Sequence, residues 1–172
     1  MKTIRLSGLI EQSLTNGEGL RKVIFSQTCY HQCKGCFNPE THNPNGGTLF
    51  ELQEIVDKIK KDVLIDGVTF SGGDPFEQAE AFSELGKAAH ESHLNVWCYT
   101  GYTYEYILEH QSKRKGWSKL LQEIDVLIDG KFEEELYDPN LQFKGSSNQR
   151  IIDVKASLEE NQVIYYQLKK PQ

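Results

Sequence analysis

The sequence has no apolar run near the roughly 18 residues that a membrane-spanning helix needs. Its first segment, MKTIRLSGLIEQSLTNGEG, lacks the long apolar core and small-residue cleavage site of a secretory signal. Positive charge is scarce, because 19 Lys and Arg face 25 Asp and Glu, for a net charge of −6. The one basic cluster, Lys113-Arg114-Lys115, is typical of a solvated turn. We therefore expect a cytoplasmic protein that binds neither membranes nor nucleic acid.

Cysteine is also rare, but its distribution is uneven. Of four cysteines, Cys29, Cys33 and Cys36 fall within eight residues, and Cys98 stands alone. Disulfides between such close neighbours would form strained, very small loops. In a reducing cytoplasm the cluster therefore indicates a metal site.

Strand-like and helix-like segments alternate along the 172 residues, a length that predicts a single domain over residues 1–172. Apolar, β-branched and aromatic runs predict strands at 21–27, 67–71, 95–100, 124–129, 150–154 and 162–168. Helical spacing of apolar residues predicts helices at 48–62, 76–93, 102–110 and 117–123. Thr48 and Glu51 form a capping-box pattern at the start of the first helix. This alternation predicts an α/β fold with a largely parallel sheet.

Three unusual segments follow three of the predicted strands. They are residues 29–36 with the cysteines, Gly72-Gly73-Asp74-Pro75, and residues 100–102. Asp74 suits a helix N-cap, and Pro75 suits the first helical position. Because chemistry in parallel α/β folds sits at the carboxyl ends of the strands, we expect these segments to converge on one edge of the sheet.

The cysteine segment has the spacing C-x3-C-x2-C. Thiolates are soft ligands that suit zinc or iron–sulfur clusters. A structural zinc site and a fully ligated cubane each take four ligands, so three cysteines would leave one iron of a cubane open. In the alternative, His31 completes a Cys3His zinc site. Cys98 lies in an apolar run and is more typical of a small buried hydrophobe.

The cysteine spacing, with Phe37 directly after the last cysteine, resembles the radical S-adenosylmethionine superfamily. The Gly72-Gly73-Asp74 segment resembles that superfamily's Gly-Gly-Glu segment, which holds the methionine ammonium of the cofactor. Asp in place of Glu is similar to one branch, the activases of anaerobic ribonucleotide reductase. Four further segments resemble this branch: 16–21 (NGEGLR, with Glu18 where Pro is usual), 97–102 (WCYTGY), 126–132 (VLIDGKF) and 145–151 (GSSNQRI).

The resemblance implies a fold, cofactors and site residues. The fold is a truncated, partial TIM-type barrel of parallel strands with helices outside, since a complete barrel needs about 200 residues or more. One 4Fe-4S cluster per chain is held by Cys29, Cys33 and Cys36, and its open iron binds S-adenosyl-L-methionine. No catalytic side chain is implied beyond cluster and cofactor. The implied cofactor-binding residues are Gly35, Cys36, Phe37, Gly72, Gly73, Asp74 and Thr100.

The resemblance also implies a reaction and partners. S-adenosylmethionine is cleaved reductively, and the radical produced takes a hydrogen from a glycine of the large anaerobic ribonucleoside-triphosphate reductase subunit, leaving a glycyl radical. A flavodoxin-type or other low-potential donor supplies the electron, and a heterotetramer with the reductase is possible within this branch. The alternatives are an activase of another glycyl-radical enzyme, a small-molecule radical enzyme, and a non-enzymatic zinc-binding interaction module.

Overall fold

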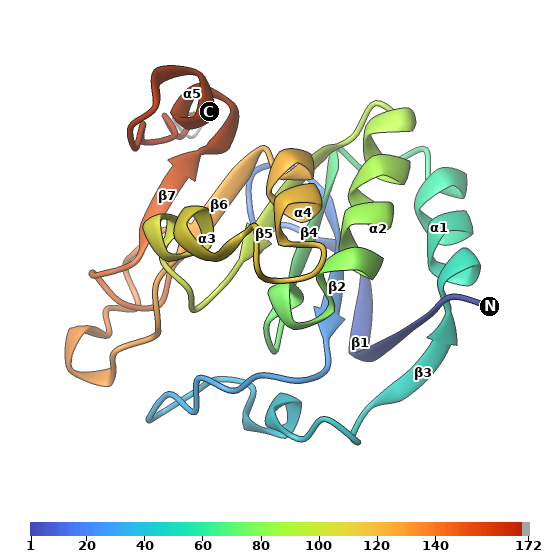
Figure 1. The fold of residues 1–172 in the computed structure, drawn as a ribbon, viewed down its shortest axis with the longest axis horizontal. Helices are drawn as coiled ribbons and strands as arrows, with labels where there is room; N and C mark the ends of the chain where they lie inside the picture. The colour runs from blue at the N-terminus through green and yellow to red at the C-terminus, as the bar shows by residue number, and fades with distance from the viewer. Residues whose placement is uncertain (170–172) are drawn as a thin grey trace.

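A seven-stranded sheet forms the centre of the structure, a computed structural model that describes residues 1–169 (Figure 1). The strands lie in the order β3-β1-β2-β4-β5-β6-β7, and the sheet is open, with β3 and β7 at its edges. The four central strands β2, β4, β5 and β6 are parallel, while β1, β3 and β7 join by antiparallel pairing. The strand bounds are β1 Thr3–Ser13, β2 Arg21–Ser26, β3 Thr48–Glu51, β4 Gly67–Gly72, β5 Asn95–Tyr99, β6 Val126–Asp129 and β7 Arg150–Asp153.

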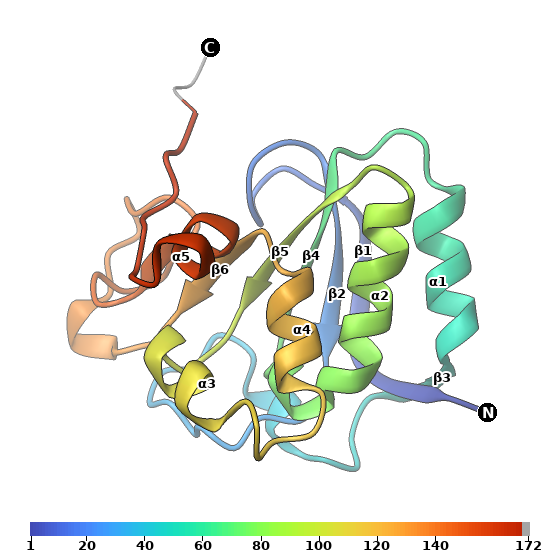
Figure 2. The ribbon, with the colours of Figure 1, turned by 45° about the horizontal axis from the view of Figure 1, so that its top comes forward.

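Helices cover one face of this sheet. Figure 2 shows α1, α2 and α4 side by side over the same face. Their apolar sides bury the core, in which Phe70 of β4 meets Phe82 of α2 edge to face, with ring centroids 4.9 Å apart. Such pairs add to the stability that apolar burial provides. The helix bounds are α1 Leu52–Lys61, α2 Ala79–Glu91, α3 Tyr104–His110, α4 Trp117–Glu123 and α5 Val154–Glu160, with short 3-10 helices η1 Pro39–His42, η2 Pro75–Gln78 and η3 Glu134–Leu136.

The other face of the sheet carries a smaller apolar cluster centred on Trp97. The ring of Trp97 is 1% exposed and contacts Phe143 and Tyr166 edge to face. The guanidinium of the buried Arg21 lies 5.3 Å from the Trp97 ring centroid. The C-terminal segment, residues 161–169, thus covers part of the face that the helices leave open.

Several predictions of secondary structure are confirmed and several are wrong. The four central strands and α4 lie where the sequence predicts them. The truncated TIM-type barrel is not confirmed, because the sheet does not close. Strand β1 was not predicted. Thr48 begins a strand rather than a helix, because residues 48–51 pair with β1; the capping box is instead formed by Glu51 and Glu54.

The predicted strand at 162–168 is also wrong. The segment contributes a single bridge between Tyr165 and Ile152 and otherwise packs through side chains. The predicted domain ends at residue 172, but its last three residues lie outside the described part of the chain. Among residues 1–169, no helix has the length and apolar character needed to cross a membrane.

Candidate functional site

The cysteine segment leaves the end of β2 and folds over the carboxyl edge of the sheet. Backbone hydrogen bonds hold its beginning: Gly73 N donates to Ser26 O at 2.8 Å, and Asp74 N donates to Thr28 O at 2.8 Å. Thr28 N in turn donates to Thr41 O at 2.7 Å. These hydrogen bonds attach the cysteine segment to the end of β4. The two segments therefore lie at the same edge of the sheet, as the sequence predicted.

The three clustered cysteines line one cavity of about 510 Å³, a volume typical of small-molecule sites. Each of these cysteines is partly buried and free of disulfide bonds. Burial raises the pKa of the Cys29 thiol to about 12 and also raises that of Cys33. Both thiols are therefore protonated near neutral pH without metal, and metal binding must release those protons.

The donor set of this cavity fits an iron–sulfur cluster with three protein ligands. Thiolates suit such clusters, and three of them border the same cavity. Among residues 1–169, no group of three or more potential ligands is already arranged around a metal position. Cys98 is fully buried in the main core and does not line the cavity, which agrees with its predicted role in packing.

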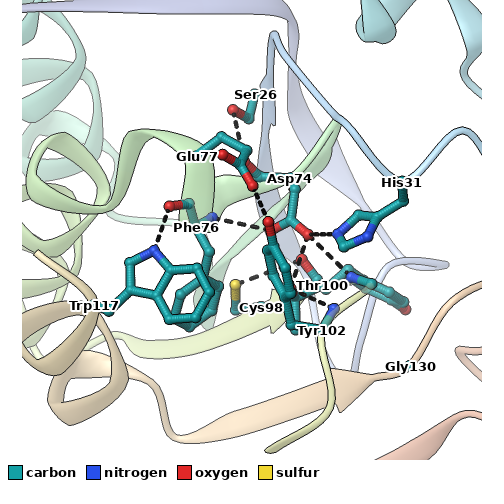
Figure 3. A network of polar contacts seen from close by, with 12 residues as sticks. Ser26, His31, Asp74, Phe76, Glu77, Cys98, Thr100, Tyr102, Trp117 and Gly130 are labelled. Carbon is teal, nitrogen blue, oxygen red and sulfur yellow. Dashed lines mark hydrogen bonds and ion pairs between the residues drawn. The ribbon is translucent and has the colours of Figure 1, made fainter. Parts of the chain in front are cut away.

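The side chain of His31 contacts a buried carboxylate. Its Nε2 lies 2.6 Å from Asp74 Oδ2 (Figure 3). Its ring also meets that of Tyr102 edge to face, with centroids 4.4 Å apart. His31 also lines the cavity of the cysteines, and because Asp74 engages Nε2, only Nδ1 of the ring is left to bind a metal in the Cys3His zinc alternative.

The glycine pair after β4 allows the cysteine segment to approach closely. A Cβ atom at Gly73 would overlap the carbonyl oxygen of Thr28, and one at Gly72 would lie 2.6 Å from Ser26 N. Gly72 also has a φ of 93°, which L side chains rarely adopt. Both glycines and Thr100 line the cavity.

Phe37 lies at the mouth of the cavity. Its ring is 63% exposed and packs on Phe132 and Tyr137, with centroid distances of 4.9 and 5.9 Å. Gly35 has a φ of 74° and faces Glu134 rather than the cavity. Of the seven predicted cofactor-binding residues, Cys36, Phe37, Gly72, Gly73 and Thr100 line the cavity, whereas Gly35 and Asp74 do not.

One wall of the cavity comes from residues 130–149. The Gln149 side chain accepts from Gly145 N at 2.9 Å and donates to Gly130 O at 3.0 Å. Asn148 donates to Lys131 O at 2.8 Å. The segment GSSNQR therefore shapes this wall by joining its two halves. Phe132 was recognised only as the end of the motif at 126–132, and Tyr137 was not singled out, because it lies in an irregular segment without periodicity.

Comparison with known proteins places the chain in a family. A family model described as a 4Fe-4S single cluster domain matches residues 15–152. A Vibrio cholerae protein named anaerobic ribonucleoside-triphosphate reductase-activating protein is 38% identical over 147 residues, which cover 80% of this chain and 90% of the relative. The chain belongs to this family of activating proteins.

Two further members of the family bear the same name. The Haemophilus influenzae protein is 35% identical over 144 residues, covering 79% of this chain and 89% of the relative. The Escherichia coli protein is 33% identical over 144 residues, covering 79% and 90%. The family model spans the three clustered cysteines and the glycine pair, whereas α5 and residues 161–169 lie beyond it.

Proposed function

We propose that this chain activates the large subunit of anaerobic ribonucleoside-triphosphate reductase as a radical S-adenosylmethionine enzyme. The observation that carries the proposal is the cavity in which three thiols face the glycine pair after β4. Membership in the family of activating proteins supports the same partner. When bound and reduced, a 4Fe-4S cluster would supply the electron that splits S-adenosylmethionine, so that a hydrogen can be taken from a glycine of the reductase.

The protein's own groups would hold and orient these cofactors. Cys29, Cys33 and Cys36 would bind three irons and leave the fourth for the amino and carboxylate groups of S-adenosylmethionine. Backbone groups at 35–36 and 72–73, together with the Thr100 hydroxyl, would position the cofactor. The Phe37 ring would shield its adenine from water. Asp74, which is fully buried, was also predicted to bind the cofactor.

An open cavity suits a reaction on another protein. The four parallel strands and the helices that cover them are the elements from which the proposed partial barrel would be built. Phe37 and Tyr137 are exposed at the mouth, where a loop of the reductase can enter. We propose a cytoplasmic location, a flavodoxin-type or other low-potential electron donor, and assembly with the reductase, with a heterotetramer as one form.

The test is an anaerobic reconstitution followed by mixing with the candidate reductase, S-adenosylmethionine and a low-potential donor. Electron paramagnetic resonance should detect a glycyl radical with the wild-type chain and none with Cys33→Ala. A wild-type preparation that holds its cluster and cleaves S-adenosylmethionine, but leaves the reductase without a radical, would contradict the proposed partner. A radical on a different glycyl-radical enzyme would support the alternative activase instead.

A further inference from the structure

Asp74 lies where three segments of the chain meet, as Figure 3 shows. Its Oδ1 accepts from Phe76 N at 3.0 Å, within η2. The hydroxyl of Thr100, after β5, donates to both carboxylate oxygens, at 3.0 and 2.9 Å. Oδ2 also accepts from Gly101 N at 3.1 Å and from His31 Nε2 at 2.6 Å. One carboxylate thus joins η2, the end of β5 and the cysteine segment.

These contacts use the whole accepting capacity of the carboxylate. A carboxylate offers about four lone-pair sites, and Asp74 receives donors from four residues. Asp74 is 0% exposed and does not line the cavity. A cofactor ammonium therefore finds no unused oxygen on Asp74.

His31 is held in place from three sides. Its side chain is only 6% exposed although it belongs to an irregular segment. Tyr102 contacts the ring edge to face, and a Cβ at Gly101 would lie 2.6 Å from the ring atom Cδ2. Glycine at position 101 therefore leaves the space that the imidazole occupies.

The backbone around His31 needs such support. Thr28 has a φ of 92° and Gln32 a φ of 53°, in the left-handed region that non-glycine residues rarely adopt. Such conformations persist only where surrounding contacts hold them. His31 lies between these two positions and two residues from both Cys29 and Cys33. Its contact with Asp74 therefore fixes the part of the segment that carries two of the three thiols.

We propose that His31 and Asp74 are positioning residues that hold the cysteine segment against the ends of β4 and β5, and that Asp74 acts on the cluster site through His31 without touching the cofactor. This inference rests on the proposed function only in taking Cys29 and Cys33 as cluster ligands. It assigns Asp74 a different role from the one that the family resemblance implied.

The first test measures the metal-free full-length chain and needs no activity. Alkylation of Cys29 and Cys33 by iodoacetamide, followed by mass spectrometry, should be about tenfold faster in His31→Ala and in Asp74→Asn. His31→Gln should recover most of the wild-type protection, because its amide can still donate to Asp74. The double variant should react no faster than the single variants, since both changes remove the same contact.

Asp153→Asn is a matched control for the loss of a helix cap. Asp153 caps α5 by accepting from Ala156 N at 3.0 Å, just as Asp74 caps η2 through Phe76 N. This control should leave alkylation of Cys29 and Cys33 at the wild-type rate. Unchanged alkylation in His31→Ala, or additive effects in the double variant, would overturn the proposal. If Asp74→Asn does not fold, the comparison of His31→Ala with His31→Gln decides alone.

The second test separates positioning from direct contact. In cluster-loaded protein, binding of S-adenosylhomocysteine should weaken in Asp74→Asn, but not weaken further when the change is made in a His31→Ala background. An equal loss in both backgrounds would mean that Asp74 acts by direct contact with the ligand or through Thr100, and either result would overturn the proposal. Failure of the proposed function would look different: the wild-type chain would hold no iron–sulfur cluster or make no glycyl radical, while the alkylation result would stand.

Discussion

The carboxylate of Glu18 accepts a hydrogen bond from the Tyr166 hydroxyl at 2.6 Å, across 148 residues of sequence. Its second oxygen accepts from the backbone N–H of Lys169, also at 2.6 Å. Glu18 stands where proline is usual in the activase motif. Its carboxylate anchors a C-terminal segment that lies beyond the region matched by the family model.

We predict that Tyr166→Phe weakens this anchor. Loss of the hydroxyl should cost about 1 kcal/mol and lower the melting temperature by about 2–4 °C. Limited proteolysis should then cut residues 161–169 more readily. Tyr165→Phe, at the exposed neighbouring position, is the control and should leave both properties unchanged. Equal effects of the two changes would argue against the anchor.

We predict that the iron content of alanine variants distinguishes the three clustered cysteines from Cys98. Alanine at Cys29, Cys33 or Cys36 should abolish stable cluster binding, because a cubane would lose one of three protein ligands. Cys98→Ala should retain the iron and sulfide content of the wild type, because Cys98 is buried in the core away from the cavity. Chemical analysis of anaerobically reconstituted proteins gives the answer. Loss of iron in Cys98→Ala would refute the ligand assignment.

We predict that Gly73→Ala disturbs the close contact between the cysteine segment and the end of β4. The new Cβ would overlap the Thr28 carbonyl oxygen, and relief of such overpacking costs about 1–3 kcal/mol. Cluster loading should fall together with the free energy of unfolding. Gly8→Ala is the control, because a Cβ there meets no atom within 4 Å. If Gly73→Ala loads its cluster like Gly8→Ala, the close approach is not needed.

We predict a pH-dependent contribution to stability from His90. Its ring contacts Asp125 at 2.8 Å and Glu123 at 2.7 Å, and the hydrogen bond to Asp125 raises the pKa of His90 above 6.5. Hydrogen bonding to His90 holds the pKa of Asp125 below 3.8, despite the opposing effect of burial. The contribution of His90 is therefore complete below its unfolded pKa and is lost as pH rises through the folded value.

The contribution of Asp125 has the opposite sign: it is complete above pH 3.8 and is lost as pH falls through the folded pKa. The ion pair should therefore stabilise the fold most between about pH 4 and 6.5. In urea titrations, His90→Asn should reduce the free energy of unfolding more at about pH 5.5 than at about pH 9. A pH-independent difference between the two proteins would contradict this assignment.

Much of the site could be predicted because its parts are local in sequence. The apolar runs of β2, β4 and β5 place the cysteines, Gly72-Gly73 and Thr100 at one edge of a parallel sheet. Strand β1 was not predicted, because most of its residues are exposed or half-buried and its pattern is irregular. The pairing of β1 with β3 decides the structure at Thr48, and no local pattern reveals that pairing.

The contact between His31 and Asp74 could not be predicted for the same reason. The two residues are 43 positions apart, and each has an adequate local explanation: His31 as a loop residue and Asp74 as a helix cap. Their meeting depends on the crossing from β2 to β4 and on the space that Gly101 leaves. At residues 162–168 the local pattern predicted a strand that does not form. The apolar alternation there reflects side-chain packing without a strand ladder.

The two sides of the cavity are joined differently at its floor and at its mouth. At the floor, buried hydrogen bonds centred on Asp74 tie the cysteine segment to the sheet. At the mouth, Phe37 meets Phe132 through ring contact, and the ion pair of Lys34 with Glu134, at 3.7 Å, is exposed to solvent. Exposed ion pairs contribute little, and aromatic faces can slide without breaking directional bonds. The contacts at the mouth are therefore broken at lower cost than the buried hydrogen bonds that hold His31 at the floor.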